Sequence, residues 1–459
     1  MKPTFTSIQG SITAAKGFVA SGVFCDIKRL GTGKGSNKGK KRDLALIVSE
    51  VPAVVAGMFT TNQVCAAPVK LCAERVQRGL AQAIVVNSGN ANACTGAQGL
   101  KDAKRMAALA GARLHLPAEH VLVGSTGRIG VPMPMKNVQR GIVEAAALLG
   151  PGPQHAAQTA EAIMTSDTRA KQVAVEMRLG NQLVRIGGIC KGAGMIQPGM
   201  SATGARPAAR PLHATMLCFI TTDAAIAQPA LQAALEEAVA LSFNRITVDG
   251  DMSTNDTVLV LANGLAKNPK LTNTSPKRRT GLRPASGHSG ARLRDNETFK
   301  SGLSHVCLEL AKMIVRDGEG VSRFVTLHVS GASSFGDAEA AARAVANSSL
   351  VKTSWCGGDP NWGRILDALG YSSARVIEAK IDVGYSLPGS KQILYSLKQG
   401  RPTRVPFRSL CRIAARKEFD LHIHLNLGQA AALLYAADLT EAYVDFNKGD
   451  VSDPASMGG

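Results

Sequence analysis

Short apolar runs alternate with alanine-rich segments along most of the chain. The runs are short and continuously apolar, as in strands buried on both faces, and they are Leu44–Val48, Ile84–Val86 and Val121–Val123. In the longer segments the apolar residues recur at helical spacing, and the predicted helices are Leu100–Leu114, Val138–Leu149, Gly336–Val345 and a segment around Leu231 and Leu235 that follows Pro229. The alternation predicts a mixed α/β protein.

The composition is that of a globular protein with a large core. Hydrophobic residues make up 45% of the 459 residues and charged residues 19%, while aromatic residues are only 4%, so the core must consist of small and branched aliphatic side chains. No apolar run approaches the roughly 18 residues that a membrane span needs. The first residues lack the apolar stretch of a secretory signal. We expect a soluble, cytoplasmic protein with no membrane partner, and no point at which the chain divides into two independent domains.

The net charge of +19 suggests nucleic acid as a partner, but its distribution argues against one. Lys28–Arg42 carries seven basic residues, Lys267–Arg294 carries eight and Ser201–His213 carries two, all without an acidic residue. These stretches are rich in Gly, Ser and Pro, which is typical of surface insertions. We therefore predict solvated loops and no nucleic-acid partner.

Neither the cysteines nor the histidines predict a metal site. The nine cysteines are scattered without a C-x-x-C pair, which favours buried free thiols over disulfides or zinc ligands. His422 and His424 alternate in an amphipathic strand, so both lie on one face of it. Because no third ligand is evident, we interpret them as a solvent-facing pair.

Three glycine-rich segments stand beside predicted strands. Asn87–Gly96 and Gly124–Gly130 each follow a strand, and Lys191–Met200 precedes the apolar segment Ala214–Asp223. Glycine lets backbone N–H groups approach a ligand closely. An N–H beside a hydroxyl, as at Thr126–Gly127, can stabilise a developing oxyanion. Each segment taken alone is more often an ordinary turn.

Together with their surroundings, these segments resemble the ornithine acetyltransferase family, also called the bifunctional glutamate N-acetyltransferase family. The resemblance covers nearly the whole chain outside the basic stretches. In order along the chain it is carried by Gly10–Val23, Gly57–Val69, Asn87–Gly96, Gly124–Gly130, Met164–Thr168, Lys191–Pro198, Ala214–Leu217, Ser242–Val258, Ile314–Gly320, Val351–Arg364 and Ala437–Asn447. So many long motifs in the expected order make the resemblance specific.

The resemblance implies a layered α/β fold and a precursor that cuts itself at an Ala-Thr bond. Carried over, the scissile bond is Ala214–Thr215. It divides the chain into an α chain, residues 1–214, and a β chain, residues 215–459, which begins with Thr215. The family is typically an assembly of two α and two β chains.

A terminal threonine carries the base that its own hydroxyl needs. A threonine hydroxyl is a poor nucleophile unless a base lies beside it. A free α-amine has a pKa of about 7.7–8.0, so a useful fraction is neutral at cellular pH. Before cleavage this amine is locked in an amide, and the precursor is therefore expected to be inactive.

The implied reaction is a two-step acetyl exchange within arginine biosynthesis. N-acetylornithine acetylates Thr215 and ornithine departs, and the amino group of glutamate then attacks the ester so that N-acetylglutamate leaves. The resemblance implies no metal and no bound cofactor. Some family members also accept acetyl-coenzyme A as donor, and the sequence leaves this second donor open.

Residue roles carry over by position. Thr126 and Gly127 match the family's oxyanion-hole pair, and Thr215 matches its nucleophile. The residues that match substrate-contacting positions are Thr165, Lys191, Thr215, Glu319, Asn447 and Ser452, the last of which stands where the family has a threonine. A lysine attracts the α-carboxylate of either substrate, and a carboxylate such as Glu319 suits the side-chain ammonium of ornithine. Without the surrounding motifs, Lys191 would be interpreted as a surface lysine.

The chain departs from the family pattern directly before the expected nucleophile. Residues 201–213 are an insertion, and it contains a second Ala-Thr pair, Ala202–Thr203. We choose Thr215 because it precedes an apolar strand, whereas the Gly-Ala-Arg-Pro after Thr203 cannot form a buried one. A nucleophile at the head of a strand is held better than one in a loop.

Two other functions fit part of the sequence. A self-cleaving amidase or aminopeptidase would use water where the transferase uses glutamate. A basic binding protein on an inactive scaffold would stay uncut and would bind nucleic acid in a salt-dependent way.

Overall fold

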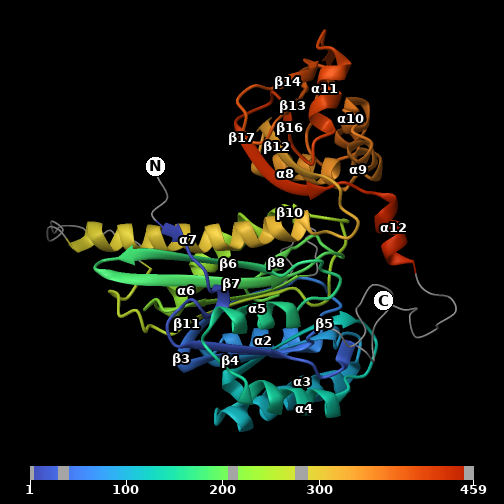
Figure 1. Ribbon diagram of the computed structural model, residues 1–459. Helices are drawn as coiled ribbons and strands as arrows, with labels where there is room; N and C mark the ends of the chain where they lie inside the picture. The colour runs from blue at the N-terminus through green and yellow to red at the C-terminus, as the bar shows by residue number, and fades with distance from the viewer. Residues whose placement is uncertain (1–4, 29–40, 205–215, 274–287, 449–459) are drawn as a thin grey trace.

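The computed structural model describes residues 5–28, 41–204, 216–273 and 288–448, and these residues form two bodies, each built on one β-sheet (Figure 1). The predicted α/β class is confirmed. The expectation that nothing divides the chain is wrong, because the second sheet has a separate core around Trp355, Tyr385 and Phe419. No composition change marks the division: helix α7 (His288–Arg316) of the first body leads through a short segment into strand β12 (Phe324–Ala332) of the second.

The first sheet has ten strands among the described residues. Its order is β1 (Phe5–Ser7), β6 (Lys171–Leu179), β7 (Gln182–Lys191), β9 (Leu217–Thr222), β11 (Thr257–Ala262), β3 (Leu44–Thr60), β4 (Leu80–Asn90) and β5 (Val121–Arg128), with β2 (Phe18–Val23) and β8 (Met200–Ser201) also paired to β3. Strand β3 is shared by two halves of the sheet. Its first part pairs with β2 and β4, and its last part pairs with β11 after a register shift between Val48 and Ala53.

This sheet folds over on itself at β3. Four strand steps separate β5 from β9, which would be roughly 19 Å in a flat sheet. Yet a Cβ on Gly124 of β5 would lie 3.0 Å from the ring of Phe219 of β9. Ile47 and Val86 of one half share a buried cluster with Phe219 and Leu259 of the other. The two halves therefore face each other across an apolar interior.

Helices cover both outer faces of the folded sheet, which gives four layers. Helices α6 (Gln228–Ala240) and α7 pack against the half that contains β7 and β9, and α3 (Gly96–Leu114) and α4 (Met135–Ala147) pack against the other half (Figure 1). Helices α2 (Ala67–Val76) and α5 (Pro153–Ala162) contribute Cys72 and Ala160 to the interior between the halves. The 3-10 helices of this body are η1 (Ser11–Thr13), η2 (Ala118–His120) and η3 (Phe243–Arg245).

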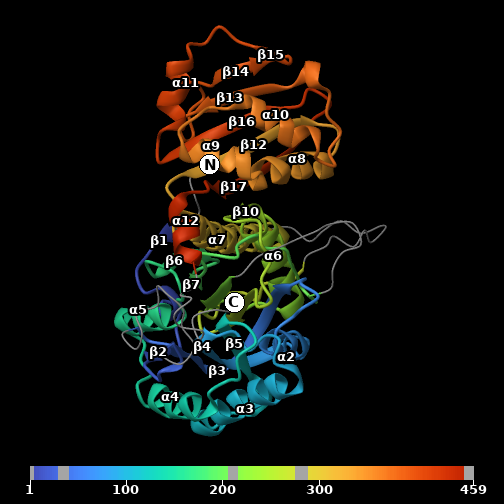
Figure 2. The same cartoon turned by 90° about the vertical axis from the view of Figure 1, so that its right-hand side faces the viewer.

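The second body is a seven-stranded sheet covered by helices. Its order is β10 (Ile246–Thr247), β17 (Ala430–Ala437), β12, β16 (Glu418–His424), β13 (Asp382–Ser386), β14 (Leu394–Lys398) and β15 (Arg401–Pro402). Its helices are α8 (Phe335–Asn347), α9 (Ser349–Cys356), α10 (Trp362–Gly370), η4 (Glu378–Lys380) and α11 (Phe407–Ala414). Helix α12 (Glu441–Asn447) then leaves this body and descends beside the first one (Figure 2).

Most predicted elements are confirmed. The predicted strands lie within β3, β4 and β5, the apolar segment before Asp223 forms β9, and the predicted helices correspond to α3, α4, α6 and α8. Every residue of β9 is buried, because Leu217 and Phe219 face the interior between the halves while Cys218 and Ile220 face α6 and α7. This two-sided burial explains why the run is apolar without alternation.

The predictions on thiols and basic stretches have mixed outcomes. All nine cysteines are free; five of them are buried as expected, whereas Cys94 is exposed and three others are partly buried. Lys28, predicted to lie in a solvated loop, is instead buried and donates a hydrogen bond of 2.6 Å to the carbonyl of Arg42. Burial lowers the pKa of Lys28 to about 8. Most of the three basic stretches lies outside the described residues. Within the described part of the chain, no helix is both long and apolar enough to cross a membrane.

Candidate active site

The head of strand β9 lies beside the end of β7. Lys191, the last residue of β7, pairs with Leu217, the first residue of β9. Lys191 and Leu217 therefore share the interior face of the folded sheet, since opposite residues of neighbouring strands point to the same side. Ala214 and Thr215, the two residues of the predicted scissile bond, lie outside the described residues.

Lys191 connects the two halves of the sheet at one end of the interior. Its Nζ donates a hydrogen bond of 3.2 Å to the hydroxyl oxygen of Thr126 on β5, and both side chains are buried. The alternative of a surface lysine is therefore wrong. Burial lowers the pKa of Lys191, although the nearby carboxylate of Asp167 opposes this shift. Because Lys191 occupies a lone pair of the Thr126 oxygen, the hydroxyl hydrogen of Thr126 is free to point at another acceptor.

Position 127 has no room for a side chain beside the backbone of Gly89. Its φ is 131°, and a Cβ there would lie 2.3 Å from the carbonyl carbon of Gly89. The residue is exposed while Thr126 beside it is buried. Thr126 and Gly127 therefore lie where the buried interior meets the exposed surface.

Asp256 is a buried carboxyl at the head of β9 that the sequence did not single out. Its Oδ1 accepts a hydrogen bond of 2.5 Å from the N–H of Met216, and its Oδ2 is buried without a hydrogen-bond partner. Burial raises the pKa of Asp256 well above its usual range, against the opposing effects of the Met216 N–H and Lys191. The Asp256 carboxyl therefore binds the backbone of the residue that follows the predicted nucleophile.

A second buried network surrounds Asp167 and reaches the backbone of Gly192, the residue after Lys191. Asp167 Oδ1 accepts hydrogen bonds from the Gly192 N–H at 2.7 Å and from Lys171 Nζ at 2.6 Å, and Lys171 Nζ also donates to Asp317 at 2.5 Å. Burial would raise the pKa of Asp167, but Lys171, Lys191 and the Gly192 N–H hold it well below its usual range. The other oxygen of Asp167 accepts the N–H of Thr165 at 3.0 Å, which brings this predicted substrate contact to the same place.

Replacing Asp167 by asparagine is expected to destabilise the fold by about 3 kcal/mol, because it leaves the buried ammonium of Lys171 with a single carboxylate. Urea unfolding followed by circular dichroism measures this change. Asp26→Asn breaks an ion pair of similar length on the surface, between Asp26 and Arg140, and should leave the unfolding midpoint unchanged. Equal midpoints for both variants would contradict a structural role for Asp167.

Glu319 and Asn447 meet where α12 reaches the first body. Asn447 Nδ2 donates to Glu319 Oε2 at 3.1 Å, and the Thr440 hydroxyl before α12 donates to the Gly320 carbonyl at 2.6 Å. A Cβ on Gly194 would lie 2.4 Å from the Glu319 carboxyl carbon, so the glutamate lies against the segment that follows Lys191. The structure thus brings together Thr126, Gly127, Thr165, Lys191, Glu319 and Asn447. Ser452 lies outside the described residues.

Thr203 follows strand β8, which pairs with β3 and not with β9. Ser201 of β8 pairs with Phe59 of β3, which pairs with Thr257 of β11, which pairs with Leu217 of β9. Three strand steps therefore separate Ser201 from the head of β9. Thr203 is exposed in the turn beyond Ser201. By strand pairing, Thr203 is therefore not a direct neighbour of Lys191, whereas Leu217 of β9 is.

Three buried aspartates of this site were not predicted from the sequence, although they lie inside the motifs named above. Asp167 belongs to Met164–Thr168, Asp256 to Ser242–Val258 and Asp317 to Ile314–Gly320. An acidic residue within each of these motifs was the available signal. Its burial was not readable, because aspartate is mostly exposed unless it is paired.

Comparison with known proteins identifies relatives along nearly the whole chain. A model of the ArgJ family matches residues 26–449. The arginine biosynthesis bifunctional protein ArgJ of Symbiobacterium thermophilum is 45% identical over 440 residues, which cover 96% of this chain and 98% of that protein. The glutamate N-acetyltransferase of Methanocaldococcus jannaschii is 41% identical over 446 residues, with coverage of 96% and 98%. A crystal structure of ornithine acetyltransferase with ornithine from Mycobacterium tuberculosis is 36% identical, with a TM-score of 0.39, and the match covers 43% of this chain and 100% of that one.

Proposed function

The chain belongs to the ArgJ family, and from this premise we propose that it transfers acetyl from N-acetylornithine to glutamate through an acetyl ester on Thr215. Family membership makes the chain an acyltransferase of arginine biosynthesis. The proposal adds the nucleophile, its origin in self-cleavage and the two substrates. The observation that carries it is the contact of Lys191 with Thr126 directly beside the head of β9.

Self-cleavage begins with the hydroxyl of Thr215. Its oxygen attacks the Ala214 carbonyl, the C–N bond breaks, and the hydroxyl proton ends on the departing nitrogen, which becomes the α-amine. An ester then joins Ala214 to the Thr215 oxygen, and water hydrolyses it to a carboxylate and a free hydroxyl. The Thr126 hydroxyl and Gly127 N–H stabilise the oxyanion of each tetrahedral intermediate.

Acetyl transfer repeats this chemistry with the new α-amine as base. The amine takes the Thr215 hydroxyl proton as the oxygen attacks the acetyl carbonyl, and it returns a proton to the leaving amine of ornithine. The α-amine of glutamate then attacks the ester, N-acetylglutamate leaves, and Thr215 regains its proton. This sequence requires neither a metal nor a bound cofactor, and acetyl-coenzyme A is a second donor compatible with the same ester.

Charges around the site match the two amino-acid substrates. Glu319 is only partly buried and is fixed by Asn447, so it is suited to the side-chain ammonium of ornithine. Lys191 offers a cation for the α-carboxylate that both substrates share. Asp256 acts as a positioning residue, since it binds the N–H of the residue that follows the nucleophile. We propose two α and two β chains as the assembly.

Mixing purified protein with N-acetylornithine, with and without glutamate, tests the proposed reaction. Ornithine release that depends on glutamate, with matching formation of N-acetylglutamate, is the expected result. Acetate release at the same rate without glutamate would instead identify a hydrolase of related mechanism. Denaturing electrophoresis of the same sample should show two fragments, corresponding to residues 1–214 and 215–459.

A further inference from the structure

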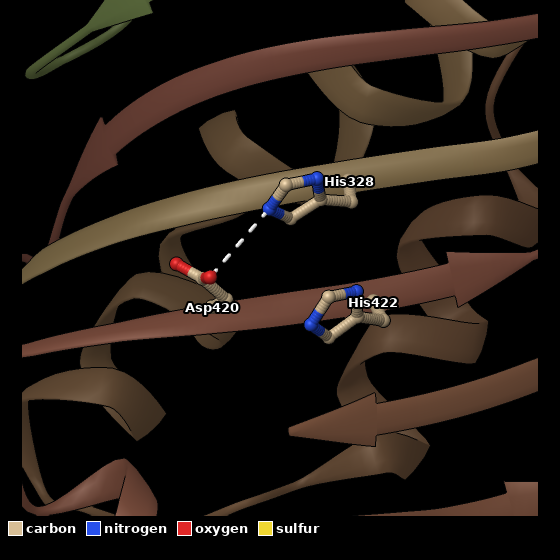
Figure 3. Close-up of side chains that lie close together, drawn as sticks. All are labelled: His328, Asp420 and His422. Atoms are coloured by element: carbon tan, nitrogen blue, oxygen red, sulfur yellow. Dashed lines mark ion pairs between the residues drawn. The ribbon is translucent and has the colours of Figure 1, made fainter. Parts of the chain in front are cut away.

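On the second body, we propose that His328, Asp420 and His422 form a binding site for a divalent transition-metal ion such as Zn²⁺. The three residues lie on the neighbouring strands β12 and β16 and point toward one another (Figure 3). Their potential ligand atoms all lie within 4.8 Å of one another. The site is separate from the residues proposed for acetyl transfer and does not depend on that function.

Strand register brings the three side chains together. His328 of β12 is the direct partner of His422 in the parallel pairing with β16, so the two imidazoles project from the same face. Asp420 precedes His422 by two residues and therefore lies on that face as well. The sequence interpretation of His422 with His424 lacked a third ligand. The pairing of β12 with β16 adds His328 to His422, and Asp420 lies on the same face of β16.

The histidine of β12 has an unused nitrogen. Nε2 of His328 is buried without a hydrogen-bond partner, although buried polar atoms normally have one. The nearest carboxylate oxygen, Oδ2 of Asp420, lies 3.8 Å away, which is too long for a hydrogen bond. A cation between these two atoms would bond to both.

Small side-chain rotations suffice to close the site around an ion. Ligand atoms of a tetrahedral zinc ion lie about 3.3 Å apart when each is about 2.0 Å from the metal. The two imidazole rings are stacked, with centroids 4.7 Å apart and an interplanar angle of 10°. The rings must therefore tilt toward each other by χ rotation, which brings ligand atoms that now lie within 4.8 Å of one another to the separation that the ion requires.

The surroundings orient the ligands and leave an open coordination position. The Gly389 N–H donates to Asp420 Oδ2 at 2.8 Å, and the Ser386 hydroxyl lies 2.9 Å from Nε2 of His422, where rotation of the hydroxyl releases the nitrogen lone pair. Both histidines line a cavity of about 500 Å³, which gives an ion access. Arg245 also lines it, and its charge is offset by Glu339 at 3.4 Å.

Metal titration of the full, untagged chain tests the site. After dialysis against a chelator, calorimetry with Zn²⁺ and the visible absorption of added Co²⁺ report binding and ligand geometry. We expect one ion per chain at this site, a rise in melting temperature with Zn²⁺, and at least about 10-fold weaker binding in His328→Asn and in Asp420→Asn. His424→Asn, on the same strand face, is the matched control and should bind Zn²⁺ as the wild type does.

Two results would overturn the proposal. One is no saturable Zn²⁺ or Co²⁺ binding by the wild-type chain, and the other is binding that is unchanged in the His328→Asn/His422→Asn double variant. Circular dichroism of each metal-free variant establishes that it is folded, and Asp420→Asn provides an independent readout if a histidine variant is not. Acetyl exchange should be equal in all these variants, so a failure of the proposed transferase function would leave this test intact.

Discussion

Thr215→Ala is expected to yield one uncut chain with no acetyl exchange. The substitution removes the hydroxyl that attacks Ala214, so the α-amine that would serve as base never forms. Both losses should be complete within the sensitivity of the assay. Denaturing electrophoresis measures the first and the glutamate-dependent release of ornithine measures the second.

Two further variants decide between the candidate threonines. Thr215→Ser keeps a hydroxyl at the same place and should still be cut, although the extra rotational freedom of serine is expected to slow the reaction. Thr203→Ala removes the hydroxyl of the second Ala-Thr pair and should be cut and active like the wild type. A processed, active Thr215→Ala protein together with an uncut Thr203→Ala protein would assign the nucleophile to Thr203.

Asp256→Ala is expected to slow both cleavage and transfer by about 10- to 100-fold, which is the effect of losing one buried hydrogen bond at a reacting group. The carboxyl binds the N–H of Met216, and without it the head of β9 has an unpaired buried donor. The time course of fragment formation in freshly synthesised chain measures cleavage. The initial rate of ornithine release measures transfer.

Two matched variants test whether the effect comes from the hydrogen bond that Asp256 accepts. Asp256→Asn keeps an acceptor for the Met216 N–H, so it should stay within about 10-fold of the wild type. Asp251→Ala removes an exposed acid from the same loop and should have no effect. If Asp256→Ala were as fast as Asp251→Ala, Asp256 would have no part in positioning the nucleophile.

Local patterns predicted the elements of the fold but not its division into two bodies. Helices α3, α4, α6 and α8 were readable because each buries its apolar residues with a regular period, and strand β9 was readable as a short, continuously apolar run. The folding of the first sheet at β3 depends on a register shift inside one long strand. The second sheet recruits β10 from a segment between α6 and β11. Pairings of this kind leave no periodic signal.

The residues that match substrate-contacting positions were predicted from the sequence, whereas the buried charged residues around them were not. Lys191 was identified from its motif, yet its burial follows from the pairing of β7 with β9 and the hydrogen bond to Thr126 on the opposite half. Asp167 and Lys171 look like ordinary surface charges in sequence, and only Asp317 from a distant segment completes their network. His328 was invisible beside His422 for the same reason. Sequence neighbours reveal motifs, whereas charge compensation is arranged between strands that are far apart in the chain.

Mass spectrometry of the denatured protein after mixing with N-acetylornithine, without glutamate, tests whether cleavage exposes Thr215 and whether this residue carries the acetyl group. We expect a fragment that begins at Thr215 and carries the mass of one acetyl group on that residue as a hydroxylamine-sensitive ester, which disappears when glutamate is added. An intact polypeptide that exchanges acetyl groups, or an acetyl group mapped to any other residue, would contradict this expectation.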